Sequence, residues 1–162
     1  HLDFHKTPEA YFDAKARLFD LLTRASSPKR ALVAALNKDD ASCARLQRSI
    51  TGARIVTYGF GSGADFQASG EALTLEGTTF SLSHAGGENA IRLRLLGRHN
   101  LRNALGAAAA AWSLGLPENW IIEGLAALKR VPGRLEPVDA GQGFSVLVDY
   151  AHTEDALLAV LD

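Results

Sequence analysis

The fold is decided by two neighbouring stretches, Val131-Pro-Gly-Arg-Leu-Glu-Pro-Val138 and Val146-Leu-Val-Asp-Tyr-Ala-His-Thr153. Each contains a short apolar run, and the linker 139–143 separates the two runs. The second run ends in polar or aromatic side chains: Asp149, Tyr150, His152 and Thr153. Apolar residues at helical spacing follow, and a buried strand that ends in polar groups just before a helix is where open α/β sheets bind ligands. A strand, a turn and Thr153 as a helix N-cap would explain the same residues without a ligand.

The rest of the chain alternates between strand and helix patterns. Continuous apolar runs at 31–36 and 54–58 predict two buried strands of a parallel sheet, with a helix at 41–50 between them. The other predicted elements are a first helix at 7–22, an antiparallel sheet within 66–96, and a helical hairpin made of 97–114 and 117–130. This order of elements predicts an α/β fold, in which a mixed sheet with flanking helices is joined by a small antiparallel sheet.

Length and composition limit the classes of function. A chain of 162 residues, 47% hydrophobic and 22% charged, can bury one ordinary core. The net charge of −1 shows no basic excess, so we expect no nucleic-acid partner, and no apolar run is long enough for membrane insertion. The single Cys43 fits a reducing compartment. The chain contains no Met, and we expect it to be a piece of a longer protein.

The glycine-rich segment Gly59-Phe-Gly-Ser-Gly-Ala64 matches the dinucleotide-binding pattern G-x-G-x-x-G/A after a strand. The pattern requires a helix to follow, but residues 65–70 have no helical periodicity and end in Gly70. We therefore interpret this segment as a turn. A dinucleotide-binding oxidoreductase is the alternative that this motif leaves open.

Lys15 is the first candidate site residue. An apolar stripe on the predicted helix 7–22 consists of Tyr11, Ala14, Leu18 and Leu22, and Lys15 falls on that stripe. A lysine in such a position most often extends its amine to the edge of the apolar face. The alternative is a partly buried amine whose pKa is lowered, which makes it nucleophilic at neutral pH.

Asn100 and Asn103 lie one turn apart at the start of the predicted helix 97–114. Asn100 as an N-cap and Asn103 as an ordinary satisfied polar residue would explain them without a ligand. As a functional pair, two side-chain amides on one helix face could bind the edge of an adenine, because an amide both donates and accepts hydrogen bonds.

Four blocks of sequence together resemble the Mur ligase family of ATP-dependent ligases. In chain order they are His1-Leu-Asp-Phe-His5 with 9–19, Ala35-Leu-Asn-Lys-Asp-Asp40, the segment 97–105, and the segment 131–157. The ending Asp149-Tyr-Ala-His-Thr153 is most similar to the MurE type, UDP-N-acetylmuramoyl-tripeptide synthetase. Glu154 departs from the family pattern, which usually has Pro there, and Lys6 stands where a small residue is common.

The resemblance implies a role for each candidate residue. Magnesium would be held by His1 and by Lys15, whose amine would be carbamylated, so that Lys15 would also be catalytic. Asn100 and Asn103 would bind the adenine end of ATP, and Arg134 and Asp149 would contact the nucleotide across a domain junction. His152 would approach the phosphates as a second catalytic residue.

The resemblance also implies the architecture and the activity of the whole protein. Residues 1–140 would be the latter half of a central ATP-binding domain without its P-loop, and 141–162 the start of a Rossmann-like C-terminal ligase domain. The enzyme would add meso-diaminopimelate or L-lysine to UDP-N-acetylmuramoyl-L-alanyl-D-glutamate, a UDP-muramoyl dipeptide, in peptidoglycan synthesis. It would thereby serve cell wall biogenesis, cell shape and cell division, as a cytoplasmic monomer that uses ATP and Mg²⁺.

Two other interpretations remain. A folylpolyglutamate or cyanophycin synthetase-like ligase would share the fold, and a non-catalytic α/β binding module would share only its scaffold. The sequence contains no G-x-x-x-x-G-K-[ST] motif, so we expect this chain to be inactive by itself.

Overall fold

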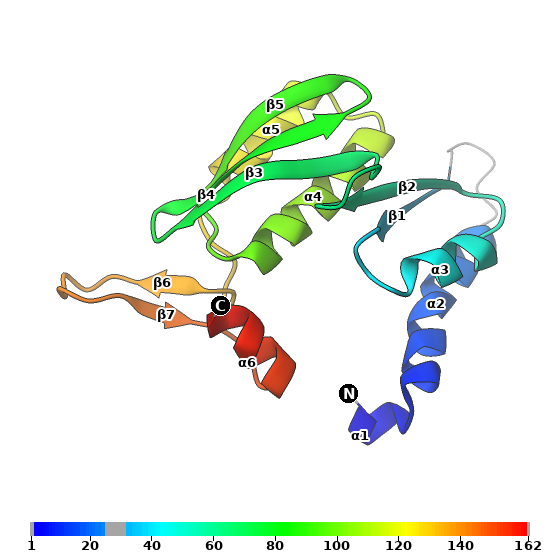
Figure 1. Cartoon of the computed structure of the whole chain (residues 1–162), viewed down its shortest axis with the longest axis horizontal. Helices are drawn as coiled ribbons and strands as arrows, with labels where there is room; N and C mark the ends of the chain where they lie inside the picture. The colour runs from blue at the N-terminus through cyan, green and yellow to red at the C-terminus, as the bar shows by residue number, and fades with distance from the viewer. Residues whose placement is uncertain (1, 25–31, 162) are drawn as a thin grey trace.

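The computed structural model describes residues 2–24 and 32–161, and it is built around one five-stranded mixed sheet (Figure 1). The strand order follows the sequence: β1 (Val33–Asn37), β2 (Arg54–Gly59), β3 (Phe66–Thr74), β4 (Gly77–His84) and β5 (Gly87–Leu93). The first three strands are parallel, and β4 and β5 continue the sheet antiparallel. The α/β fold expected from the sequence is therefore confirmed, with the antiparallel part joined to the parallel part in one sheet.

Helices lie on both faces of the sheet. The helices are α1 (Leu2–His5), α2 (Pro8–Arg24), α3 (Cys43–Ser49), α4 (Arg98–Ser113), α5 (Glu118–Ala127) and α6 (Glu154–Leu161). On one face α4 contacts the first three strands and α5 contacts β5, and these helices cover the larger apolar core. On the other face a smaller core forms around Ala34, Leu36 and Cys43. Because β1 contributes to both cores, it has the continuous apolar sequence of a strand buried on both sides.

The glycine-rich segment after β2 forms a short turn, as the sequence predicts. β3 follows it directly and pairs parallel to the end of β2, so no helix begins at this turn. The Asp65 carboxylate fixes the segment before β3 against β2, because it accepts hydrogen bonds from the backbone N–H and the hydroxyl of Thr57, both at 2.7 Å. The structure lacks the helix that a dinucleotide fingerprint requires at this point.

The predicted apolar stripe of α2 is not the face that this helix buries. Leu18 is 66% exposed, and Ala14 and Lys15 are also exposed. Instead Phe19 packs against the smaller core, and the guanidinium of Arg45 lies over the ring of Phe12 at 3.7 Å from its centroid. The prediction was wrong because the aromatic rings of Phe12 and Phe19, on a neighbouring face of the helix, make the contacts with α3 and the smaller core.

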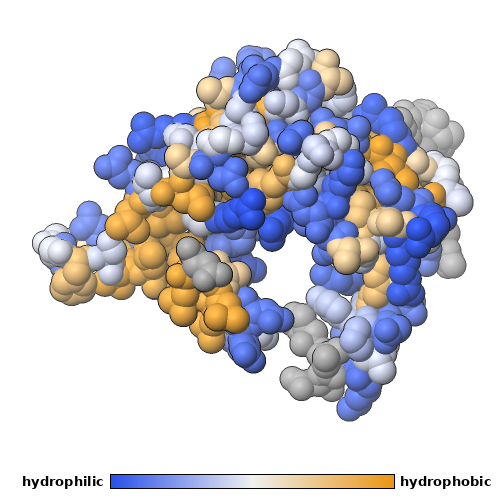
Figure 2. Space-filling view, in the orientation of Figure 1, coloured by the Kyte–Doolittle hydropathy of each residue, from blue (hydrophilic) through white to orange (hydrophobic). Residues whose placement is uncertain are grey.

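The C-terminal segment forms a separate antiparallel ribbon of β6 (Glu136–Val138) and β7 (Val146–Val148), followed by α6. The prediction of a buried strand at 146–148 was wrong, since all three residues of β7 are exposed. In the described part of the chain, β7 pairs with β6 alone, and its side chains remain 37–47% exposed. Figure 2 shows the resulting apolar surface over the ribbon and α6. No described helix is long and apolar enough to span a membrane.

Gly77 and Gly124 offer a matched pair of substitutions that tests this packing. A Cβ at Gly77 would lie 2.2 Å from the carbonyl oxygen of Leu93, and the residue has φ 136°. We expect Gly77→Ala to reduce the free energy of unfolding by about 3 kcal/mol, because backbone must move in the sheet. Gly124→Ala, in open space on α5, should instead stabilise by about 0.5–1 kcal/mol. Denaturant unfolding of both variants measures the difference, and equal stabilities would contradict the described register.

Candidate active site

A cavity of about 440 Å³ lies between α4 and the chain that leads from β7 into α6. Its wall includes His99, Asn103, Arg134, Asp149, Tyr150 and His152. Four residues that the sequence singled out, Asn103, Arg134, Asp149 and His152, therefore line one cavity although they come from distant parts of the chain. The amide, the guanidinium, the carboxylate and the imidazole are groups suited to a polar, charged ligand.

Asp149 connects the segment before β6 to the segment after β7, and both line the cavity. Its carboxylate accepts the backbone N–H of Leu135 at 2.8 Å and that of Ala151 at 2.7 Å. The N–H of Tyr150 donates to the carbonyl of Gly133 at 2.9 Å, next to the ribbon pairing of β6 with β7. These bonds bring Arg134 to the same cavity as Asp149. A carboxylate has about four acceptor positions, so Asp149 keeps capacity for a ligand hydroxyl.

Leu135 adopts an unusual backbone conformation at this junction. It is buried and has φ 47°, in the left-handed region that non-glycine residues rarely occupy. Its side chain packs against Gly97, where a Cβ would lie 2.6 Å from the Leu135 Cδ1. The glycine before α4 and the strained leucine therefore fit one another, and the Asp149 bond to the Leu135 N–H supports the conformation.

Asn100 does not line the cavity. Its side chain is buried, and its amide nitrogen donates to the carbonyls of Leu96 at 2.8 Å and Arg134 at 3.3 Å. The interpretation of Asn100 as the N-cap was wrong, because α4 begins at Arg98 with Gly97 before it. The amide thus anchors the turn that carries Arg134, while Asn103 is exposed at the cavity.

His152 is exposed on the cavity wall. Its Nδ1 lies 2.8 Å from the carbonyl oxygen of Tyr150. Because a carbonyl only accepts, Nδ1 carries the proton in this contact, and Nε2 remains for a ligand. Thr153 caps α6 through its hydroxyl, which accepts the N–H of Ala156 at 3.3 Å, so the expected N-cap is confirmed.

His99 is a cavity residue that the sequence analysis missed. Both of its ring nitrogens are buried, and no described residue forms a hydrogen bond with them. Burial lowers the pKa of His99, with the charges of Arg134 and Arg102 acting in the same direction and Asp149 opposing them. A sequence signal was available, because His99 lies four residues before Asn103 and so shares its helix face.

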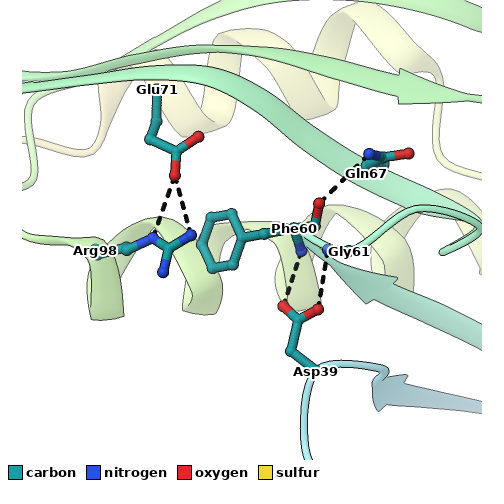
Figure 3. Close-up of polar contacts among 6 residues, drawn as sticks. All are labelled: Asp39, Phe60, Gly61, Gln67, Glu71 and Arg98. Carbon is teal, nitrogen blue, oxygen red and sulfur yellow. Dashed lines mark hydrogen bonds and ion pairs between the residues drawn. The ribbon is translucent and has the colours of Figure 1, made fainter.

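A second polar region lies at the carboxyl end of β1, where Lys15 is nearby. Asp39 binds the turn after β2, accepting the N–H groups of Phe60 at 2.8 Å and Gly61 at 3.0 Å (Figure 3). The pKa of Asp40 is lowered, chiefly by hydrogen bonds from Ser42 and in smaller part by the charge of Lys15. Lys15 is exposed, with Nζ 5.1 Å from the ring centroid of Tyr11, so the premise of a partly buried amine was wrong.

A larger cavity, about 580 Å³, contains none of the predicted site residues. Two of its polar side chains already have partners: Asp65 binds Thr57, and His84 lies 3.1 Å from Glu118. Hydrogen bonds from His84 and Asn89 lower the pKa of Glu118. We assign the candidate site to the smaller cavity, because four of the residues that the sequence singled out line it.

Comparison with known proteins identifies the family of this chain. Residues 1–111 match the family described as the Mur ligase middle domain. The chain belongs to the Mur ligase family. A UDP-N-acetylmuramoyl-L-alanyl-D-glutamate–2,6-diaminopimelate ligase of Listeria monocytogenes is 41% identical over all 162 residues, which cover 33% of that protein.

Solved structures of Mur ligases share the fold. MurF from Acinetobacter baumannii superposes with a TM-score of 0.84 at 25% identity, over 98% of this chain and 33% of that one. A structure of a UDP-N-acetylmuramoyl-L-alanyl-D-glutamate–2,6-diaminopimelate ligase matches at a TM-score of 0.78 and 33% identity, over 99% of this chain and 32% of that one. The chain thus spans about a third of the length of the relatives that it matches.

The described residues do not provide a complete set of ligands for the magnesium ion expected for a Mur ligase. Among residues 2–24 and 32–161, no three His, Cys, Asp or Glu side chains are grouped so as to hold a metal ion. Both carboxylate oxygens of Asp39 bind backbone N–H groups, and His1 lies outside the described residues. The described side chains therefore do not by themselves fit a magnesium site.

The buried, neutral His99 makes stability depend on pH. Its folded pKa lies below the usual 6.5, so the unfolded chain takes up a proton first as pH falls, and stability is lost below about pH 6.5. We expect His99→Phe in the full-length protein to flatten the dependence of unfolding free energy between pH 7 and 5 by up to about 1.4 kcal/mol per pH unit. Denaturant unfolding at several pH values in this range measures the unfolding free energy of variant and wild type. If the two depend on pH with the same slope, the neutral imidazole is contradicted.

Proposed function

We propose that this chain is part of an ATP-dependent ligase that adds the third amino acid to UDP-N-acetylmuramoyl-L-alanyl-D-glutamate in peptidoglycan synthesis. The observation that carries the proposal is the cavity that Asn103, Arg134, Asp149 and His152 line together. Membership of the Mur ligase family and the diaminopimelate ligases among its relatives support the reaction. They favour 2,6-diaminopimelate as the incoming amino acid over lysine.

In this proposal the cavity binds the nucleoside and phosphates of ATP. The Asn103 amide would bind the edge of the adenine, and the Asp149 carboxylate would accept hydrogen bonds from the ribose hydroxyls. Arg134 would bind phosphate oxygens, for which the planar guanidinium is well matched. Asn100 acts through the backbone of Arg134, since its amide donates to the Arg134 carbonyl. Nε2 of His152 would approach the phosphates from the C-terminal side.

The proposed reaction has two steps. A carboxylate oxygen of the muropeptide attacks the γ-phosphorus of ATP, and the bond to the β–γ bridging oxygen breaks to release ADP. The amine of the incoming amino acid then attacks the acyl carbon, phosphate leaves and the nitrogen loses a proton. The protein's share is to hold the reactants in line and to exclude water from the acyl phosphate.

We further propose that magnesium binds near Lys15, with His1 as a second ligand. The ion would neutralise charge on the transferred phosphoryl group. Exposure of Lys15 allows carbon dioxide to reach its amine for carbamylation. The remaining ligands would come from outside the described residues. Residues 1–140 would belong to the central domain and 141–162 to the C-terminal one, in a cytoplasmic monomer.

The reaction is tested with the full-length protein, ATP, Mg²⁺, the UDP-muramoyl dipeptide and either diaminopimelate or lysine. We expect ADP release that requires both the dipeptide and the amino acid, with the tripeptide product seen by mass spectrometry. Arg134→Ala should raise KM for ATP roughly tenfold or more, because it removes a charge-assisted contact. Arg45→Ala, an exposed arginine paired with Asp13, is the matched control. Turnover with folate and glutamate instead would favour the folylpolyglutamate interpretation.

Lys15 is tested separately. Lys15→Ala in the full-length protein should abolish most activity, and a short-chain carboxylate such as acetate should restore part of it by supplying the missing carboxylate. Since Lys15 is exposed, we expect the free energy of unfolding to change by less than about 0.5 kcal/mol. An active Lys15→Ala enzyme would refute the metal role of this residue.

A further inference from the structure

Buried polar atoms without partners gather at the start of α4. Among the described residues, four buried side-chain atoms lack a hydrogen-bond partner: His99 Nδ1, His99 Nε2, Arg102 Nε and Ser113 Oγ. Three of the four belong to two residues one helical turn apart, which share a helix face. Such groups are costly to leave unpaired, and their clustering marks a place where the helix is prepared for a ligand.

The Arg102 guanidinium lies against an aromatic ring. It is 5.6 Å from the ring centroid of Phe60, and the guanidinium of Arg98 lies 4.1 Å from the same centroid. The two arginines differ in their other partners. Arg98 donates to Glu71 through Nε at 3.2 Å and Nη2 at 3.0 Å (Figure 3), whereas the ion pairs among the described residues do not include Arg102. Arg102 therefore keeps its donors for another acceptor.

Phe60 is itself fixed in place. The Asp39 carboxylate binds the N–H groups of Phe60 and Gly61, so the turn after β2 is fastened to the carboxyl end of β1. This turn holds the Phe60 ring toward α4, as Figure 3 shows for the contact with Arg98. A cation over a ring face loses conformational freedom before any ligand arrives, which favours binding.

Arg102 lies between the two polar regions of the site. Its charge contributes to lowering the pKa of Asp40, after the larger effect of the Ser42 hydrogen bonds, and it also lowers the pKa of His99, after the larger effect of burial. Asp40 follows β1 on the side of Lys15, and His99 lines the cavity. If the cavity holds the nucleoside and the transferred phosphoryl group lies near Lys15, the phosphate chain must pass between them.

We propose that Arg102 binds the phosphate chain of the nucleotide and that Phe60 positions its guanidinium for this contact. The proposal rests on the nucleotide site proposed above and adds to it a residue other than Asn103, Arg134, Asp149 and His152. The N–H donors of the Arg102 guanidinium suit phosphate oxygens, which are anionic acceptors that a guanidinium can bind through two parallel hydrogen bonds.

The test compares ADP with adenosine as ligands of the full-length protein, each measured by competition against a fluorescent ATP analogue. We expect Arg102→Ala to weaken ADP binding roughly tenfold or more and to leave adenosine binding within about twofold, because only ADP carries the phosphates. Arg102→Lys should restore part of the ADP affinity by returning the charge. Arg98→Ala is the matched control, since this arginine lies over the same ring but is paired with Glu71. We expect it to change neither affinity by more than about twofold.

The other outcomes overturn the proposal. An equal loss for ADP and adenosine in Arg102→Ala would mean that Arg102 only supports His99 and Asn103. Equal effects of Arg98→Ala and Arg102→Ala on ADP would mean that stacking on Phe60 matters and phosphate contact does not. An unchanged ADP affinity in Arg102→Ala would also refute it. Failure of the wild-type protein to bind ADP at all would instead refute the nucleotide site itself, so the two failures are distinguishable.

Discussion

The Asp149 carboxylate forms hydrogen bonds with the backbone N–H groups of Leu135 and Ala151, and the candidate site depends on these two bonds. They join the turn that carries Arg134 to the strand end that carries His152. Leu135 is buried in a left-handed conformation, so its N–H would otherwise be an unpaired buried donor, which costs about 1–3 kcal/mol. The same carboxylate faces the cavity, so one side chain both assembles the site and is available to a ligand.

Helix α4 supplies the opposite wall, and its small residues decide how close it lies to the sheet. Ala104, Ala108 and Ala109 are buried in the larger core. A Cβ at Gly106 would come within 3.0 Å of the Tyr58 ring, so a larger residue there would push the helix away from β2. The close approach brings His99, Arg102 and Asn103 to the carboxyl ends of the parallel strands, where α/β proteins bind their ligands.

Sequence reasoning found most elements because their signals are local. The apolar runs predict β1 and β2, and the alternation of apolar and polar residues predicts β3 to β5. Both patterns can be seen within a few neighbouring residues, because successive side chains of a strand point to opposite faces. It failed where burial depends on a partner element. The helical stripe predicts that Leu18 faces the core, but Phe12 and Phe19 make the contacts of α2. The three residues of β7 are apolar and yet exposed. A helical stripe shows that a face is apolar, and it does not show which of two faces docks.

The sequence by itself determined the family and singled out Asn103, Arg134, Asp149 and His152 as candidate site residues, because the order and spacing of motifs are properties of the chain alone. The tertiary structure decided that these four meet at one cavity and that Asn100 turns away from it to bind the Arg134 carbonyl. It also added His99 and Arg102, whose buried ring nitrogens and Nε, respectively, have no hydrogen-bond partner among the described residues. The physical reason is that packing of α4 with the turn after β2 and the C-terminal ribbon brings together groups that are far apart in sequence. Only this packing decides which polar groups find a hydrogen-bond partner among the described residues and which do not.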